Sequence, residues 1–343
     1  MTGRLALRTA PRETRLLIVY DLSAQPFSVG DLLIYQEASL VIRARYGIDM
    51  VDLAIVYDPR DPVVRDPAFR MIDPESFLFH LSYILPAAQV NPHLGSLLLF
   101  DSHSRLETFV VNSGQEYLVW PDLRLYASAE YLFYYCFNEL FFEHYERHGS
   151  LPALKSRPAA RAWADAFVDA NSDGCVPATI QLRRNPVNPA RNSKYDDWIV
   201  FFEHCAKRYP VKFFVICARS EIDPRLRELS NVIVVKDHCT GLEQDLALIE
   251  AARFHMGASS GPGTIAQLNA NPYCKFGWKI NPALLKGLVR EGHRYRFYFS
   301  GPFQNWIIEE ETASMLIGEF EHIWGALLKD LTRKAEPARQ TGL

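Results

Sequence analysis

Short apolar runs alternate with amphipathic stretches over the first 150 residues. The apolar runs are typical of buried strands, and in the stretches between them apolar residues recur with the period of an α-helix. Ser28 is a suitable N-cap for the first helix, with Asp31 three residues on. Strands are expected at 16–20, 51–58 and 96–101, and helices at 31–45 and 75–85. This order predicts a parallel sheet covered by helices.

The middle of the chain changes character twice. Residues 127–147 carry aromatic side chains on nearly every helical face, which favours a buried helix over a surface that binds sugar or lipid. Residues 149–175 then bring Gly149, Pro152, Pro158 and a polar run, and we place a domain junction there.

A second series of strands and helices begins at residue 176. Strands are expected at 176–182, 211–218, 231–235 and 253–258, and helices at 195–208, at 242–252 and from 265. Thr240 and Glu243 are spaced as a capping box for the helix at 242–252. The whole pattern predicts an α/β protein with two Rossmann-like, doubly wound domains.

Four ranges describe the expected organisation. They are an N-terminal arm at 1–14, a first domain at 15–150, a second domain at 175–330 and a tail at 331–343. The length of 343 residues agrees with two domains of about 150 residues each.

Composition excludes several classes of protein. The chain is 48% hydrophobic and 22% charged, which is typical of globular proteins and argues against disorder. Its net charge of −3 argues against a nucleic-acid binder. No apolar run reaches the roughly 18–20 residues of a membrane span, although peripheral membrane contact stays open. The start of the chain lacks the apolar core of a secretory signal, and the six cysteines form no CxxC pair, so we expect reduced thiols and a cytoplasmic protein.

Two arginines follow the strand at 176–182. Ligands of an open α/β sheet bind beyond the carboxyl ends of its strands, and a guanidinium presents a planar fork of donors to phosphate oxygens. Gln181, Arg183, Arg184 and Asn185 are therefore candidate ligand-binding residues. Neighbours along a strand point to opposite faces, so we expect only one arginine to face the ligand, and a surface salt bridge is the alternative.

A Gly/Ser-rich loop follows the strand at 253–258 and leads into a helix. Free N–H groups, hydroxyls and a helix start together form an anion site. The loop is neither a Walker A sequence nor GxGxxG, and a purely structural turn is the alternative. Its candidate residues are Gly257, Ser259, Ser260, Gly261, Gly263 and Thr264.

A third group of candidates follows the strand at 231–235, where a nucleobase or ribose would lie. Asp245 is an acid on an otherwise apolar helix, so it is expected to accept hydrogen bonds from a ribose or from the Ser259 region. The alternative is an acidic residue near the helix N-terminus that the helix dipole favours. Cys217, near the end of the strand at 211–218, and Arg219, just after it, are expected to line the same site. The group comprises Lys236, Asp237, His238, Asp245, Cys217 and Arg219.

Residues 176–278 resemble the donor-binding half of GT-B glycosyltransferases. The segments ATIQLRRN, FFVICARSEID, NVIVVKD and DLALIEAARFHMGASSGPGTIAQL are similar to the fucosyltransferase-like superfamily and to bacterial glycosyltransferases with a DLxLLxxxxxxxGxSSG segment. The fucosyltransferases end the first of these strands in His-x-Arg-Arg followed by Thr-Asp. Here Gln181 stands for the histidine, and Asn185 and Pro186 replace Thr-Asp.

The resemblance implies a nucleotide-sugar donor, with a GDP-sugar favoured, although Gln181 and Pro186 depart from the pattern. It implies that Arg183 contacts the pyrophosphate, that Ser259 and Ser260 hold the phosphates, and that Asp245 lies near the base or ribose. The first domain would then take the acceptor, whether a glycan, a lipid-linked glycan or a protein, and the second the donor.

The chemistry expected from these residues is sugar transfer without a metal. No Asp-x-Asp pair occurs in the chain, and Arg183 with a helix start is suited to stabilise a leaving diphosphate. An inverting transfer needs a base, for which Asp21 is the first candidate because the first strand–helix loop commonly faces the ligand. The other candidates are Asp58, Asp101 and His103. A nucleotide-sugar epimerase and a non-catalytic nucleotide-sugar or glycan binder are the alternative functions.

Overall fold

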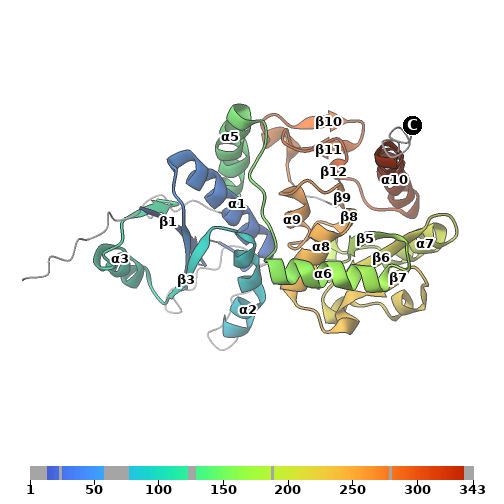
Figure 1. Cartoon of the computed structure of the whole chain (residues 1–343), viewed down its shortest axis with the longest axis horizontal. Coiled ribbons are helices and arrows are strands. Elements are labelled where there is room, and N and C mark those ends of the chain that lie inside the picture. Colours follow the sequence, from blue (N-terminus) through green and yellow to red (C-terminus); the bar gives the residue numbers. More distant parts are fainter. Residues whose placement is uncertain are drawn as a thin grey trace, which may run out of the picture.

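Two sheets with helices between and around them form the protein (Figure 1). A computed structural model describes residues 14–22, 25–57, 77–122, 129–186, 189–277 and 280–335. The first sheet has the order β3-β2-β1-β4, and all its pairs are parallel. Its strands are β1 (Arg15–Asp21), β2 (Val51–Val56), β3 (Leu94–Phe100) and β4 (Tyr117–Trp120).

The second sheet has the order β10-β11-β12-β9-β8-β5-β6-β7. It is parallel from β7 to β12, and the short strands β11 and β10 extend it as an antiparallel edge. Its strands are β5 (Val176–Gln181), β6 (Val211–Ile216), β7 (Val232–Val234), β8 (Phe254–Ala258), β9 (Tyr273–Phe276), β10 (Val289–Glu291), β11 (Arg294–Arg296) and β12 (Gln304–Ile307). The parallel part follows the doubly wound order, so the expected fold class is confirmed.

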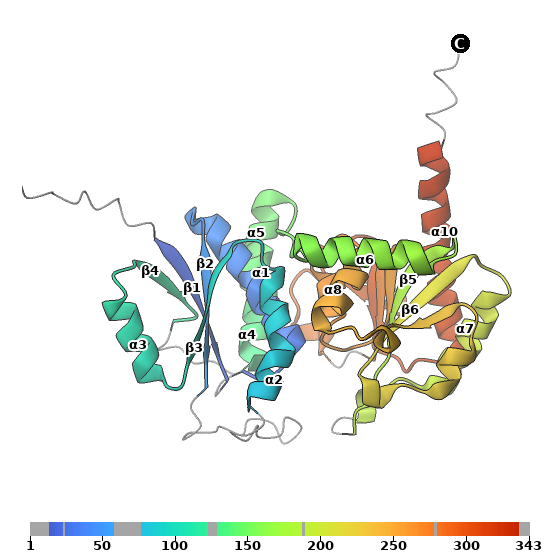
Figure 2. The same cartoon turned by 60° about the horizontal axis from the view of Figure 1, so that its bottom comes forward.

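Helices cover both faces of each sheet (Figure 2). They are α1 (Val29–Tyr46), α2 (Phe77–Ile84), α3 (His103–Asn112), α4 (Ala129–Tyr135), α5 (Phe141–His148), α6 (Pro158–Asn171), α7 (Tyr195–Ala206), α8 (Leu242–Ala251), α9 (Thr264–Gln267) and α10 (Ala313–Ala335). Figure 2 shows α3 on the outer side of the first sheet, and α1, α2, α4 and α5 on the side that faces the second sheet. Within the described residues, no helix is both long enough and apolar enough to cross a bilayer.

Helix α1 lies in the middle of the protein. The Ser28 hydroxyl accepts the N–H of Asp31 at 3.3 Å, as the cap predicts, and Gly47 ends the helix with φ 65°. Thirteen of the fourteen positions 29–42 are buried, Asp31 being the exception, because one core joins α1 to both halves. Leu32 and Val41 of α1 belong to the same buried cluster as Leu246 of α8. The two halves therefore share a hydrophobic core.

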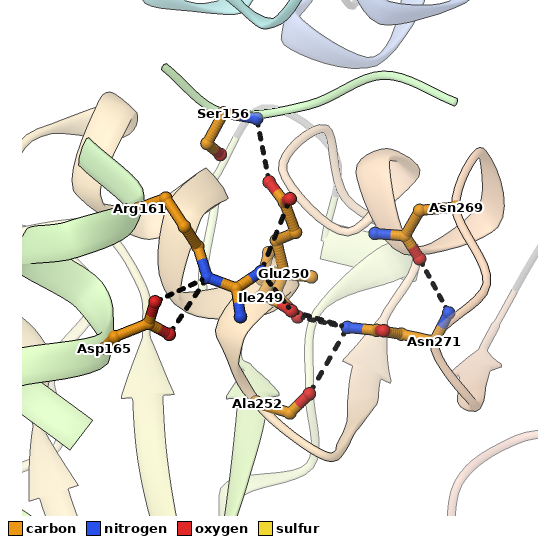
Figure 3. A network of polar contacts seen from close by, with 8 residues as sticks. All are labelled: Ser156, Arg161, Asp165, Ile249, Glu250, Ala252, Asn269 and Asn271. Atoms are coloured by element: carbon orange, nitrogen blue, oxygen red, sulfur yellow. Dashed lines mark hydrogen bonds and ion pairs between the residues drawn. The ribbon is translucent and has the colours of Figure 1, made fainter. Parts of the chain in front are cut away.

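The stretch 149–175, expected as a junction, contains the helix α6. Its small buried residues Ala160, Ala164 and Val168 recur at every fourth position and give a weak apolar signal. Figure 3 shows how the helix is held: Arg161 contacts Glu250 of α8 at 3.4 Å, and Glu250 accepts the N–H of Ser156 at 2.8 Å. The side chain of Asn271 caps the carbonyls at the end of α8. The predicted domain bounds stay predictions, although α10 continues past residue 330 into the range expected for the tail.

The aromatic stretch is helical in its described part and packs against the second half. A π-helical turn at Cys136–Leu140 joins α4 to α5. Phe137 in that turn stacks on Phe297 with ring centroids 4.5 Å apart, and its carbonyl accepts the Tyr298 hydroxyl at 2.8 Å. The aromatic residues therefore bury a contact between the two halves.

The capping box expected from Thr240 and Glu243 is wrong by one residue. The N-cap of α8 is Gly241, whose N–H donates to the Gln244 side chain at 2.9 Å. The Thr240 hydroxyl instead donates to the carbonyl of Val235 at 3.2 Å, because the preceding 3₁₀ turn folds back on the strand end.

Candidate functional site

The strand order of the second sheet reverses between β5 and β8. From β5 the chain proceeds to β6 and β7 on one side, whereas β8, β9 and β12 follow on the other. Gln181 pairs with Gly257 at the carboxyl ends of these two strands. Arg183 and Ser259 both lie two residues beyond that pair, so they emerge at the same edge of the sheet. A reversal of this kind is where open α/β sheets bind ligands.

Glycine is required at two positions of this edge. Gly257 has φ 150°, and a Cβ there would lie 2.3 Å from the Gln181 carbonyl oxygen. A Cβ on Gly261 would lie 2.9 Å from Cβ of Val29, at the start of α1. Both glycines thus serve close backbone packing. Gly263 lies against the ring of His255, and Thr264, buried at the start of α9, lies beside Gly30.

The two predicted arginines have different surroundings. Arg184 contacts Asp223 at 3.2 Å and lies over the Tyr195 ring at 4.0 Å. Arg183 is partly buried, and its Nε has no hydrogen-bond partner among the described residues. Its backbone is held by Ser193, whose hydroxyl accepts the Arg183 N–H at 3.2 Å. The two arginines therefore have different partners, and the expectation that only one of them faces a ligand stays a prediction.

A third arginine, Arg191, joins the site and was not singled out from the sequence. It ends the 3₁₀ turn Pro189–Arg191 between β5 and α7, and its Nη2 donates to the carbonyl of Ser259 and, at 3.3 Å, to the Ser259 hydroxyl. Burial lowers the pKa of Arg191, the Arg183 charge lowers it further, and Asp31 works against both. Two guanidinium groups thus lie close enough to repel each other. The sequence signal that could have pointed to Arg191 is its position as a third arginine within ten residues of the end of β5.

The start of α1 faces the same loop from the first half. Burial raises the pKa of Asp31, and the Ser28 hydroxyl and the Arg191 charge oppose that rise. The helix expected from residue 265 is the single turn α9, too short for a substantial dipole. The 18-residue α1 directs its amino end at this loop instead. Of these two helices, α1 therefore presents the larger dipole to the loop.

Asp245 forms a buried ion pair with Lys236 rather than a contact with Ser259. The Lys236 Nζ lies 2.6 Å from its Oδ2, and the Oδ1 has no hydrogen-bond partner among the described residues. Burial raises the pKa of Asp245 to about 6, against the pull of Lys236. The proximity of Asp245 to a base or ribose stays a prediction.

Tyr83 of α2 approaches this part of the site from the first half. It is 53% exposed, and its hydroxyl interacts electrostatically with Arg183, Glu221 and Asp245. Desolvation by the surrounding protein, followed by the two carboxylates, raises the pKa of Tyr83 to about 12. Tyr83 and Glu221, which lies in the turn Arg219–Glu221 after β6, were not among the residues singled out from the sequence either.

The remaining predicted residues lie around this site with other partners. Asp237 pairs with Arg227 at 2.7 Å, and His238 packs on Phe167 with ring centroids 4.9 Å apart. The Gln181 side chain donates to the Ile216 carbonyl, and the N–H of Asn185 donates to the Asn192 side chain. The Ser260 hydroxyl is buried and meets no hydrogen-bond partner among the described residues. Cys217 is buried and Arg219 is exposed.

The base candidates of the first half lie elsewhere. Asp21 contacts His103 at 3.2 Å. Leu17 and Val19, on the same face of β1, pack beside Leu106 of α3, so Asp21 points to the outer face of the sheet, away from α1. Asp101 pairs with Arg105 on the surface, and Asp58 lies outside the described residues. In the part of the chain that the structure describes, no three His, Cys, Asp or Glu residues are grouped as for a metal ion.

Comparison with known proteins identifies the fold. No protein family and no curated protein sequence matches the chain. Among solved structures, it is similar to a glycosyl transferase family 9 protein from Veillonella parvula, with TM-score 0.58 and 12% identity over 92% of this chain and 98% of that one. It is also similar to the ADP-heptose LPS heptosyltransferase II of E. coli, with TM-score 0.52 and 10% identity over 92% and 99% of the two chains. The chain therefore has the two-sheet α/β fold of these glycosyltransferases.

Proposed function

We propose that the protein transfers a sugar from a nucleoside diphosphate donor to a hydroxyl group of an acceptor. The observation that carries the proposal is the convergence of Arg183, Arg191 and the 259–263 loop at the strand reversal, with the amino end of α1 opposite. Two repelling guanidinium groups, serine hydroxyls and the start of α1 are suited to a doubly charged anion such as a diphosphate. The fold shared with glycosyltransferases supports the same function.

In the proposed reaction, the acceptor oxygen attacks the anomeric carbon as the bond from that carbon to the phosphate oxygen breaks. The nucleoside diphosphate leaves with the bonding electrons, and Arg183 and Arg191 stabilise the charge that develops on it. The proton of the acceptor hydroxyl passes to the Asp31 carboxylate. This assignment places Arg183 and Arg191 on the leaving group and Asp31 on the nucleophile.

Asp31 replaces Asp21 as the proposed base. Asp31 interacts with Arg191 and lies at the helix start that packs on the 259–263 loop, whereas Asp21 faces the outer side of its sheet and contacts His103. The raised pKa of Asp31 makes its carboxylate a better proton acceptor than an ordinary aspartate.

The donor and the acceptor belong to the proposal as well. The resemblance to fucosyltransferases favours a GDP-sugar, while the E. coli protein of similar fold is named for ADP-heptose. The acceptor is proposed to be a glycan, a lipid-linked glycan or a protein, held by the first half. No metal ion is required in this scheme, because the two arginines supply the positive charge.

Calorimetric titration with ADP, GDP, UDP and CMP tests the binding part of the proposal. Micromolar affinity for one of the diphosphates, weakened at least about tenfold in Arg191→Ala and kept in Arg208→Ala, is the expected result. Arg208 is an exposed arginine at the end of α7 that contacts His204, so it controls for the loss of a charge. Failure of every diphosphate to bind overturns the proposal. Binding without release of sugar to water or acceptor supports the non-catalytic alternative.

A further inference from the structure

Helix α7 begins directly after the segment that carries the two site arginines. Arg183 and Ser193 close the base of this segment: the Ser193 hydroxyl accepts the Arg183 N–H, and the Ser193 N–H donates to the Arg183 carbonyl at 2.8 Å. The N–H of Asn185 donates to the Asn192 side chain at 2.8 Å, and the Asn192 amide donates to the Asn185 carbonyl at 3.1 Å. Arg191 lies within the stretch of chain that these two pairs enclose. The positions of both arginines are therefore tied to the start of α7.

The same helix end holds a second part of the site. Tyr195, the first residue of α7, donates its hydroxyl to the carbonyl of Glu221 at 2.6 Å. The Tyr195 ring is buried and lies against the guanidinium group of Arg184. The start of α7 thus contacts the chain beyond both β5 and β6, which are neighbours in the sheet.

Glu311 holds this helix end from another element. It lies between β12 and α10, and its Oε1 accepts the N–H of Lys194, the N-cap of α7, at 2.6 Å. In return, the Asp197 carboxylate in the first turn of α7 accepts the N–H of Ala313, the first residue of α10, at 2.8 Å. A lysine side chain has no acceptor with which to cap a helix start, so Glu311 supplies one for α7.

Burial makes the strength of this contact depend on protonation. Glu311 is 7% exposed, and burial raises its pKa to about 7. The charge of Asp197 adds to this rise, whereas the Lys194 N–H, the Trp198 indole and the Lys194 charge oppose it. An ionised carboxylate accepts a hydrogen bond about twice as strongly as a neutral acceptor does. The contact between Glu311 and the start of α7 should therefore strengthen when Glu311 loses its proton.

We propose that Glu311 is a positioning residue for the nucleoside diphosphate site. Its ionised carboxylate holds the start of α7, and thereby Arg183 and Arg191, in the arrangement that binds the diphosphate. Glu311 acts through α7 and makes no contact with the ligand. The inference rests on the proposed function and deepens it, because nucleotide affinity then depends on the protonation of a buried carboxyl group outside the site.

Glu311→Gln tests this role, because glutamine keeps an acceptor for the Lys194 N–H but cannot ionise. Calorimetry gives the dissociation constants for inorganic pyrophosphate, ADP, GDP and UDP at about pH 5.5 and about pH 8.5. The variant and the wild type should bind alike at the lower pH. At the higher pH the wild type should bind about 2- to 30-fold more tightly than the variant.

Glu310→Gln is the matched control. Glu310 is the exposed neighbour of Glu311 and pairs with the Lys194 side chain at 2.9 Å. An exposed pair of this kind contributes little, so Glu310→Gln should follow the wild type at both pH values. The control therefore separates the buried contact to the helix start from the mere loss of a negative charge nearby.

Other groups that titrate in this range are common to all the proteins compared. The terminal phosphate of the probe is one of them. Lys275, a buried lysine of β9, is another: burial, followed by the Arg191 charge, lowers its pKa to about 7. Burial raises the pKa of Asp245 to about 6. The difference between Glu311→Gln and the wild type at each pH cancels these contributions.

The outcomes separate the inference from the proposed function. Equal affinities of Glu311→Gln and the wild type at both pH values, together with weakened binding in Arg191→Ala, overturn the role of Glu311 and leave the function standing. Absence of pyrophosphate and nucleotide binding to the wild type overturns both. Glu311→Ala removes the acceptor and should bind at least as weakly as Glu311→Gln at the higher pH. A loss of stability in urea denaturation with unchanged affinity in Glu311→Ala would show a merely structural role. Either variant decides the question if the other does not fold.

Discussion

Replacing Arg191 by alanine should separate ligand binding from stability. The guanidinium group is a charged donor aimed at the place where the diphosphate is proposed to lie, and one such contact contributes about 1.5–3 kcal/mol. The variant should therefore bind the preferred nucleoside diphosphate about 10- to 150-fold more weakly. Arg191→Lys keeps the charge without the planar fork and should fall between the wild type and the alanine variant.

The stability of the same variant should change little. Removing Arg191 abolishes its bonds to the carbonyl and hydroxyl of Ser259, but it also relieves the repulsion from Arg183 and removes the cost of partly burying a charge. These effects oppose each other, so we expect the free energy of unfolding to stay within about 1 kcal/mol of the wild type. Titration calorimetry and urea denaturation measure the two quantities. Unchanged affinity with a loss of 2 kcal/mol or more in stability (about that of two hydrogen bonds) would show that Arg191 only braces the loop.

Four further predictions concern other parts of the protein. Asp31→Asn should lower kcat about 10²- to 10⁴-fold while nucleotide affinity is kept, because only proton transfer is lost; equal losses in both would contradict a role as base. Lys275→Met should stabilise the fold most below pH 7. Because the pKa of Lys275 is lowered to about 7, the unfolded state binds the proton more tightly, and the stability of the wild type rises as the pH increases above about 7. The stabilisation by Lys275→Met should therefore be smaller at pH 9 than at pH 6, and denaturation at these two pH values would test this. Gly261→Ala should destabilise by about 1–3 kcal/mol, since its Cβ would press on Val29 and part α1 from the loop; a melting temperature equal to that of the wild type would refute this packing. Sugar transfer should survive dialysis against EDTA, and recovery only after addition of Mg²⁺ or Mn²⁺ would overturn the metal-independent scheme.

The strand ends of the second half were predictable because their signals are local. Apolar runs of five to eight residues mark buried strands, and the residues that follow them meet at one edge of a parallel sheet. Arg183 and the loop at 257–264 were singled out as candidates in this way, and the structure gives Arg184 other partners than Arg183 has. The helix α6 escaped because alanine gives a weak apolar signal at positions that are nonetheless buried.

The partners of the charged residues could not be read from the chain order. Asp21 and Asp31 flank the same loop, and only the packing of α1 and α3 on opposite faces of the first sheet separates them. Asp245 was expected to accept bonds from a ribose or from the Ser259 region, and the tertiary structure adds an ion pair with Lys236, because the turn after β7 brings that lysine beside α8.

Local patterns of apolar and polar residues were thus enough to predict a doubly wound α/β chain and to place its candidate ligand residues at one edge of the second sheet. The interaction partners of the charged residues at that edge arise from the way the two halves pack, which brings Arg191, Lys275 and Asp31 close to one loop. Hydrophobic periodicity depends on neighbours along the chain, whereas electrostatic interactions depend on distances in space that long-range packing sets.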